Sequence, residues 1–176
     1  MITYDIIIIG SGPGGYTTAA EACRLGLRVM LAERGELGGT CLNRGCIPTK
    51  ALCRTAETAM DCAKARDLGI DIGKPSIDYA RAAARKDEVV ASLREGVAMA
   101  LAGVDIVRGE ARFAGEHVVA VGNDEYSAPR IIIATGSRPA SLSIEGADDA
   151  ADSDEMLALT ELPADLVIIG GGGIGM

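Results

Sequence analysis

Apolar residues follow two kinds of pattern along the chain, which are short unbroken runs and longer stretches with helical spacing. The isoleucines at 6–9 and at 131–133 form continuous β-branched runs, which are typical of parallel strands buried on both faces. From Val90 to Leu101, apolar residues recur every three or four positions, as on the buried stripe of a helix. Two further strands are expected at residues 27–33 and 104–107, and helices at residues 14–25, 46–65 and 78–102.

The order of these elements predicts the fold class. Strand, glycine-rich turn, helix and strand succeed one another within the first 33 residues, which is the pattern of a βαβ unit. Residues 117–121 and 125–127 predict a small antiparallel excursion before the isoleucine strand at 131–133. We therefore expect an α/β fold with a parallel sheet and a small antiparallel excursion.

The turn after the first strand carries a dinucleotide-binding fingerprint. In Gly10-x-Gly12-x-x-Gly15, the first glycine permits a tight turn, the second lets a phosphate approach the backbone, and the third lets helix and strand pack closely. Glu33 lies at the end of the next strand, where a carboxylate can accept hydrogen bonds from an adenosine ribose. The pattern predicts a dinucleotide site but does not distinguish FAD from NAD.

Residues 166–175 repeat the pattern of the opening. The apolar run Leu166–Ile169 is expected to be a strand, and it leads into glycines at 170, 172 and 175. No helix follows in the sequence, so this second turn is an incomplete dinucleotide site. We expect the front part of a longer protein, with one domain over residues 1–160 and the start of a second dinucleotide-binding domain at residues 163–176.

Charge and composition exclude other functions. The net charge is −8 and no stripe of Lys and Arg is present, which argues against nucleic acid as a partner. No apolar run reaches the ~20 residues that span a bilayer, so no membrane association is expected. Without a secretion signal, the five cysteines argue against a structural disulfide framework and for a cytoplasmic protein. Cys23, Cys53 and Cys62 are interpreted as small packing residues.

Cys41 and Cys46 are the candidate chemistry of the chain, because two nearby thiols can store two electrons as a disulfide. Residues five apart in a regular α-helix have Cα atoms about 8.7 Å apart. This separation exceeds the ~7 Å limit for a disulfide, so a bridge would require a distorted turn before a regular helix. Cys46 would then lie at a helix N-terminus, which favours a thiolate. Unlinked thiols or half of a zinc site remain alternatives, although no second Cys or His pair completes a zinc site and no metal is expected.

Residues 38–52, with the sequence GGTCLNRGCIPTKAL, strongly resemble the redox-active disulfide motif of the pyridine nucleotide–disulfide oxidoreductases. Leu42-Asn43 and residues 47–52 look most like the dihydrolipoamide dehydrogenases of that family. The resemblance extends from the first glycine turn to the segment 134–139 and the final glycine cluster. It implies a Rossmann-like FAD-binding domain, followed by the start of an NAD-binding domain.

The resemblance also implies a reaction and a set of site residues. Dihydrolipoamide and NAD+ would be converted to lipoamide and NADH through FAD, with Cys41 attacked by the substrate thiolate and Cys46 facing the flavin. The residues implied for FAD are Gly10, Gly12, Gly14, Gly15, Glu33, Arg34, Gly39, Thr40, Lys50, Ala111, Thr135 and Gly136. The residues implied for NAD are Gly170, Gly172 and Gly175.

The implied partners are the dihydrolipoyl group on a carrier domain of a 2-oxoacid dehydrogenase complex and a second copy of the chain in a homodimer. The family takes its acid–base His–Glu pair from a C-terminal interface domain, and the single histidine, His117, matches no such position. We therefore expect the 176 residues alone to be inactive. The alternatives are an enzyme like glutathione or mercuric reductase, or a non-catalytic FAD-binding fragment with structural cysteines.

Overall fold

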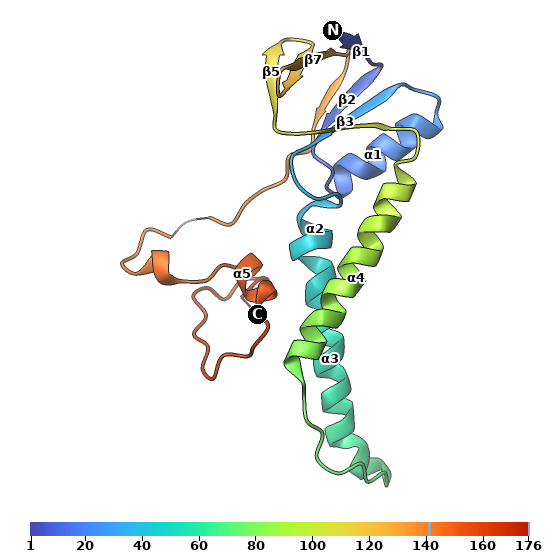
Figure 1. The fold of residues 1–176 in the computed structure, drawn as a ribbon. Helices are drawn as coiled ribbons and strands as arrows, with labels where there is room; N and C mark the ends of the chain where they lie inside the picture. Colours follow the sequence, from blue (N-terminus) through green and yellow to red (C-terminus); the bar gives the residue numbers. More distant parts are fainter. Residues whose placement is uncertain (141, 176) are drawn as a thin grey trace. The chain divides into compact units, whose positions relative to one another are not determined.

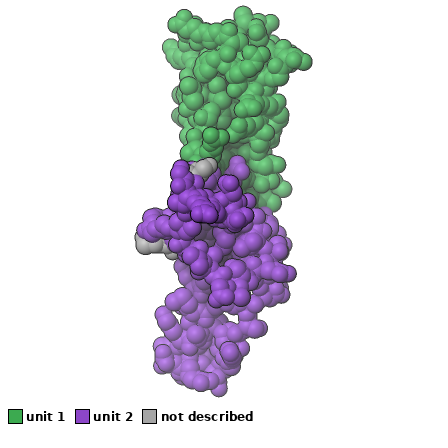
Figure 2. All heavy atoms as spheres, turned by 90° about the vertical axis from the view of Figure 1, so that its left-hand side faces the viewer, with its two compact units in different colours: residues 1–43, 90–138 green, residues 44–89, 139–176 purple. Residues whose placement is uncertain are grey.

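The structure, a computed structural model, describes residues 1–140 and 142–175 (Figure 1). The chain forms two compact units, which Figure 2 distinguishes by colour. Unit 1 comprises residues 1–43 and 90–138, and unit 2 comprises residues 44–89 and 139–176. The predicted domain boundary near residue 160 is a different division of the chain and stays a prediction.

A four-stranded parallel sheet is the centre of unit 1. Its strands are β2 (Ile6–Ile9), β3 (Val29–Glu33), β4 (Asp105–Arg108) and β8 (Ile131–Ile133), in the order β4-β3-β2-β8. Ile7 lies in register with Met30 on one side and with Ile131 on the other. All four residues of β2 are buried, as the unbroken isoleucine run predicts. This strand order places the carboxyl ends of β2 and its two neighbours together at one edge.

A second, mixed sheet packs on the parallel one. Its strands are β1 (Ile2–Thr3), β7 (Asp124–Ser127), β6 (Val118–Val121) and β5 (Ala111–Gly115), in that order. Strands β5, β6 and β7 are antiparallel, whereas β1 is parallel to β7. Ile7, Met30, Val119 and Tyr126 belong to one buried cluster formed by residues of both sheets. The excursion is therefore larger than predicted, since β1 and β5 were not expected as part of it.

Helices complete unit 1. Helix α1 (Pro13–Arg24) packs against β2 and β3 and buries Gly15, Ala19 and Ala22. The small side chains of this helix allow its backbone to approach the sheet closely. Helix α2 (Gly39–Arg44) is short and buries Leu42. Helix α4 (Tyr79–Ala100) belongs to unit 1 from residue 90 onward, where Val90 and Val97 are buried.

Unit 2 contains helix α3 (Cys46–Lys64), the 3-10 turn η1 (Ala65–Leu68), the first half of α4, the 3-10 turn η2 (Ala147–Asp149) and helix α5 (Ser153–Ala158). A capping box starts α5, with the Asp152 side chain accepting from the backbone N–H groups of Asp154 and Glu155. The buried Lys86 ammonium donates to the carbonyl oxygen of Leu157 at 2.7 Å, which attaches this segment to α4.

The predicted strand at residues 166–169 is wrong. These residues form no strand among those that the structure describes, and Val167 is 88% exposed. An apolar run becomes a strand only when a neighbouring strand pairs with it, and no other segment of the described chain does so. The remaining predicted strands and helices are present, with ends that differ by a few residues.

Candidate functional site

The first glycine turn joins β2 to α1, and each of its three glycines has a different environment. Gly10 has a φ of +99°, and a Cβ added to it would lie 2.3 Å from the carbonyl oxygen of Ala134. A Cβ on Gly15 would lie 1.8 Å from the carbonyl oxygen of Gly10. At Gly12, in contrast, the nearest atom is the Cα of Gly39 at 4.0 Å. The fold itself thus requires glycine at positions 10 and 15, whereas at position 12 it leaves space.

The start of α1 is open to an anion. Gly12 is its N-cap residue and therefore offers no side chain to cap the first N–H groups, while Gly14 is exposed and has no atom within 4 Å of an added Cβ. Uncapped N–H groups at a helix N-terminus suit a phosphate. Free space at Gly12, an uncapped helix start and an exposed Gly14 together fit the pyrophosphate of a dinucleotide.

Glu33 at the end of β3 interacts with the glycine turn. Its Oε2 accepts hydrogen bonds from the backbone N–H and the hydroxyl of Ser11, at 2.7 and 2.6 Å, and its Oε1 accepts from the N–H of Gly35 at 2.7 Å. Partial burial raises the pKa of Glu33, but these hydrogen bonds, with the charge of Arg108, outweigh it and leave the pKa lowered. The carboxylate is thus ionised and anchored at the position predicted to receive the ribose.

Ser11 was missed by the sequence analysis because the fingerprint leaves its position unspecified. It is fully buried, and its interaction with Glu33 links the β2–α1 turn to the end of β3. A buried hydroxyl needs a hydrogen-bond partner, so a serine between two glycines followed by a strand-end acid was the available signal. Arg34, in contrast, is exposed and pairs with Glu110 at 3.2 Å.

The loop before the cysteines lies against the glycine turn. Gly38 and Gly39 have φ angles of +100° and +63°, a conformation that favours glycine. The N–H of Gly38 donates to the carbonyl oxygen of Ser11 at 3.0 Å, and a Cβ on Gly39 would lie 2.5 Å from the Cα of Gly12. The two motifs identified in the sequence are therefore in direct contact within unit 1.

Cys41 and Cys46 lie on either side of an interruption in helical structure. Cys41 is half-buried within α2, and Cys46 is exposed and is the first residue of α3. Gly45 separates the two helices with a φ of −145° and a ψ of −112°. Pro48 is buried in the first turn of α3, where its missing N–H is not needed. The distorted turn and the regular helix after it are confirmed, and the pairing of the two cysteines stays a prediction.

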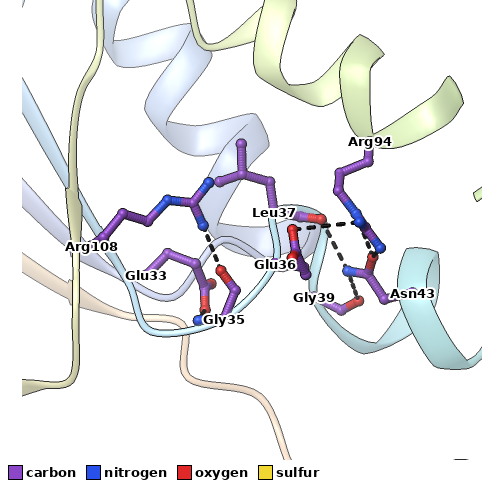
Figure 3. A network of polar contacts seen from close by, with 8 residues as sticks. All are labelled: Glu33, Gly35, Glu36, Leu37, Gly39, Asn43, Arg94 and Arg108. Atoms are coloured by element: carbon purple, nitrogen blue, oxygen red, sulfur yellow. Dashed lines mark hydrogen bonds and ion pairs between the residues drawn. The ribbon is translucent and has the colours of Figure 1, made fainter. Parts of the chain in front are cut away.

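The loop before the cysteines contacts the glycine turn and is also held by a network of polar side chains (Figure 3). The Asn43 amide donates to the carbonyl oxygens of Leu37 and Gly39, both at 2.9 Å. Its Oδ1 accepts from Nε and NH2 of Arg94 in α4, at 3.1 and 2.9 Å. Arg94 also forms an ion pair with Glu36 at 3.5 Å, and Arg108 donates to the carbonyl oxygen of Gly35. Of the residues in this network, only Gly39 was proposed from the sequence as a site residue.

The other residues implied for FAD fall on several elements. Thr40 is exposed on α2, Lys50 is exposed on α3, and Ala111 is half-buried at the start of β5. Thr135 and Gly136 follow β8, and the Cα of Thr135 would lie 3.2 Å from a Cβ on Gly10. The structure thus brings Gly39 and Thr135 to the glycine turn. Cys46 and Lys50 belong to unit 2, and their FAD-facing roles stay predictions.

The second glycine cluster repeats the local geometry of the first. Gly170 has a φ of +112°, and a Cβ on Gly175 would lie 2.1 Å from the carbonyl oxygen of Gly170. The N–H of Gly175 donates to the carbonyl oxygen of Gly172 at 3.0 Å, as that of Gly15 does to Gly12 at 2.8 Å. The turn therefore has the shape of a dinucleotide fingerprint, although no strand precedes it.

Two further observations concern the chain as described. Within residues 1–140 and 142–175, no three His, Cys, Asp or Glu side chains come together as a metal site would require. His117 is exposed at the turn between β5 and β6. None of the described helices has the length and apolar character needed to cross a membrane.

Comparison with known proteins assigns this arrangement to a family. The profile of the family "Pyridine nucleotide-disulphide oxidoreductase" matches residues 4–176, nearly the whole chain. The chain belongs to this family. The resemblance stated from residues 38–52 is thereby confirmed, as is the α/β fold class with its parallel sheet.

Individual members of the pyridine nucleotide–disulphide oxidoreductases support the assignment. Dihydrolipoyl dehydrogenase of Thermus scotoductus is 44% identical over 180 residues, and a dihydrolipoyl dehydrogenase of Bacillus subtilis is 41% identical over 181. The solved Cu(II) complex of the HOCl-induced flavoprotein disulfide reductase RclA from Escherichia coli matches with a TM-score of 0.85 and 36% identity, covering 99% of this chain and 38% of that one. The alignments with the two dehydrogenases cover 100% and 99% of this chain but only 39% and 38% of those relatives.

Proposed function

We propose that this chain is the FAD-binding and disulfide-bearing part of an oxidoreductase that converts dihydrolipoamide and NAD+ to lipoamide and NADH. The observation that carries the proposal is the contact of Gly39, in the loop before the cysteines, with Gly12 of the glycine turn. The helix that contains Cys41 begins at Gly39, next to Gly12, and this closeness supports the proposal. The relatives named dihydrolipoyl dehydrogenase, at 41–44% identity, support the choice of substrate.

The cysteines carry the exchange chemistry of the proposal. With Cys41 and Cys46 joined as a disulfide, a substrate thiolate attacks Sγ of Cys41, the Sγ–Sγ bond breaks, and Cys46 leaves as a thiolate. The second substrate thiol, once deprotonated, attacks the mixed disulfide, which releases the cyclic disulfide product and leaves Cys41 reduced. Cys46, whose sulfur leaves, is the first residue of α3 and is exposed. FAD held at the glycine turn would supply the redox chemistry, as the acceptor of the electron pair of the Cys41–Cys46 dithiol on its way to NAD+.

The chain's own residues bind and orient the cofactors in this proposal. The open helix start at Gly12 and Gly14 receives the FAD pyrophosphate, and the ionised Glu33 accepts hydrogen bonds from the ribose. Thr40, Lys50, Ala111 and Gly136 contribute the contacts implied by the family motif. Gly170, Gly172 and Gly175 begin the corresponding turn for NAD.

The wider context of the proposal follows from the same relatives. The substrate is the dihydrolipoyl group on a carrier domain of a 2-oxoacid dehydrogenase complex, and the complete protein acts as a homodimer. The acid–base His–Glu pair implied by the family matches no residue of the 176. Cytoplasmic localisation stays a prediction from the sequence.

The proposal is tested by the absorbance of the flavin-loaded protein during anaerobic two-electron reduction. We expect a long-wavelength charge-transfer band from the Cys46 thiolate to the flavin. Cys46→Ser abolishes the band, whereas Cys41→Ser produces it before any reductant is added, because Cys46 then has no disulfide partner. Cys53→Ser, a change at an exposed cysteine of the same helix, leaves the band as in the parent. Persistence of the band in Cys46→Ser, or failure of the parent to bind FAD, contradicts the proposal.

A second candidate is a reductase of another disulfide or of a metal ion. The specific observation in its favour is the similarity to RclA, which is described as a flavoprotein disulfide reductase in complex with Cu(II). Steady-state assays of the complete protein distinguish the two candidates. NAD+-dependent oxidation of dihydrolipoamide supports the first, while NADH- or NADPH-dependent reduction of glutathione disulfide, Hg(II) or Cu(II) without dihydrolipoamide oxidation supports the second.

A further inference from the structure

The Asn43 side-chain amide is held in one orientation, because hydrogen-bond donors lie on one side of it and acceptors on the other. Its Oδ1 faces the Arg94 guanidinium, which only donates hydrogen bonds, and its Nδ2 faces two carbonyl oxygens, which only accept. A flipped amide would place donors against the guanidinium and an oxygen against the two carbonyls. Asn43 is therefore a fixed connection between α4 and the loop before α2 (Figure 3).

Asn43 donates to the carbonyl groups of the residues on either side of Gly38. Leu37 and Gly39 flank Gly38, and Gly38 and Gly39 both have positive φ angles. Two consecutive glycines lose more conformational freedom on ordering than other residues would, so this loop needs contacts that compensate. The contacts are those of Asn43 on one side and of Ser11 and Gly12 on the other.

Arg94 stabilises this arrangement through its two hydrogen bonds more than through its ion pair. The ion pair with Glu36 is long, at 3.5 Å, and the Glu36 side chain is 62% exposed, so water weakens it. The bonds from Nε and NH2 to Asn43 are shorter and use the planar fork of the guanidinium. Arg94 comes from a helix 51 positions further along the chain, so this contact connects two distant segments of unit 1.

We propose that Arg94 and Asn43 are positioning residues for Cys41. Cys41 lies midway between Gly39, whose carbonyl Asn43 holds, and Asn43 itself. The Arg94–Asn43 pair thus fixes both ends of the five-residue segment that presents the Cys41 sulfur, and fixes that segment against the glycine turn. The proposal rests on the proposed function only in taking Cys41 as the sulfur that meets the substrate.

The experiment measures the alkylation rate of individual cysteines in the reduced protein without flavin. Arg94→Met keeps an apolar stem and removes the guanidinium donors, and Asn43→Asp keeps the acceptor for Arg94 but removes both donors to the loop. Loss of one such hydrogen bond changes an equilibrium about 2- to 10-fold. Each variant loses two hydrogen bonds, so we expect Cys41 alkylation about 4- to 100-fold faster in both, with Arg94→Lys intermediate.

Two controls separate positioning from general loss of stability. Cys53, exposed on α3, serves as the internal reference, and Arg85→Met removes an exposed arginine from the same helix as Arg94. We expect no change in Cys53 alkylation in any variant, and no change at Cys41 in Arg85→Met. Unchanged Cys41 alkylation in Arg94→Met or Asn43→Asp overturns the proposal, and so does a parallel rise at Cys41 and Cys53.

A second measurement distinguishes failure of this inference from failure of the proposed function. In the flavin-loaded protein, Arg94→Met is expected to shift the disulfide reduction potential while the flavin absorbance before reduction stays as in the parent. A parent protein without a charge-transfer band contradicts the proposed function and leaves the alkylation result as the test of positioning. A parent with the band, together with an Arg94→Met variant of identical potential and alkylation, contradicts the positioning role alone.

Discussion

The three glycines of the first turn allow the requirements of the fold to be separated from those of the ligand. A methyl group added at Gly15 would lie 1.8 Å from a carbonyl oxygen, whereas real Cβ atoms essentially never come within 3.0 Å of another atom. The start of α1 would have to move by about 1.2 Å away from β2, which disturbs packing between the helix and the sheet. At Gly12 the added methyl group would have 4.0 Å of space and a φ of −65°, which any residue adopts.

These distances give different magnitudes for the two substitutions. We expect Gly15→Ala to lower the free energy of unfolding by about 3 kcal/mol, with or without FAD. Gly12→Ala should change the free energy of unfolding of the flavin-free protein by less than about 1 kcal/mol. Alanine is a poorer N-cap than glycine, but it also restricts the unfolded chain, and the two effects oppose each other. Its methyl group occupies the predicted pyrophosphate position, so the affinity for FAD should fall about 10- to 100-fold, through lost hydrogen bonds to a charged group.

The assay combines urea unfolding of the flavin-free variants with fluorescence titration of FAD. Gly14→Ala is the matched control for stability, because its added Cβ meets no atom within 4 Å on an exposed helical position. Alanine there is expected to stabilise the helix by up to about 1 kcal/mol. The reasoning is refuted if Gly12→Ala destabilises the flavin-free protein as much as Gly15→Ala does, or if it binds FAD as tightly as the parent.

Two further predictions concern a carboxylate and a helix cap. The pKa of Glu33 is lowered in the folded state, so its ionised form adds stability above its unfolded pKa, and this stability is lost as the pH falls through the folded pKa. Glu33→Gln should lower the free energy of unfolding at pH 7, and the stability of this variant should no longer depend on the ionisation of residue 33. If the substitution lowers the free energy of unfolding by the same amount at pH 3 as at pH 7, this prediction is contradicted. Asp152→Ala removes the cap of α5, costing about 1 kcal/mol, and should accelerate amide hydrogen exchange at Asp154 and Glu155; unchanged exchange would show that the cap is dispensable.

The parallel sheet could be predicted because its signal is local. Continuous β-branched runs, such as Ile6–Ile9, and a glycine turn before a helix identify buried strands and a βαβ unit without knowledge of their partners. Strand β5 gave no such signal. Its sequence Ala-Arg-Phe-Ala-Gly has no regular alternation, and four of its five residues are exposed, so pairing with β6 alone defines it.

The residues of the candidate site also include some that a local pattern predicts and some that it does not. The glycines and cysteines follow fixed spacings, so their positions could be predicted from the sequence. Arg94 could not, because it is 51 residues from Asn43 and no motif contains it. Ser11 is an intermediate case, because its position in the motif is unspecified and its partner Glu33 lies 22 residues away. Whether a polar side chain finds a partner depends on tertiary packing, which no local pattern encodes. At residues 166–169 the local pattern predicts a strand, but no strand of the described chain pairs with the run, and it is irregular.

The second glycine turn has a consequence for the order in which the chain folds. Gly170 and Gly175 approach as closely as Gly10 and Gly15 do, although the residues before them pair with no strand in the described chain. The turn therefore closes from contacts only five residues apart, and even a 10-residue loop closes in about 10–100 ns. We expect the first turn to form equally early and to bring the end of β2 and the start of α1 together before the parallel strands, whose pairing requires distant segments, have assembled.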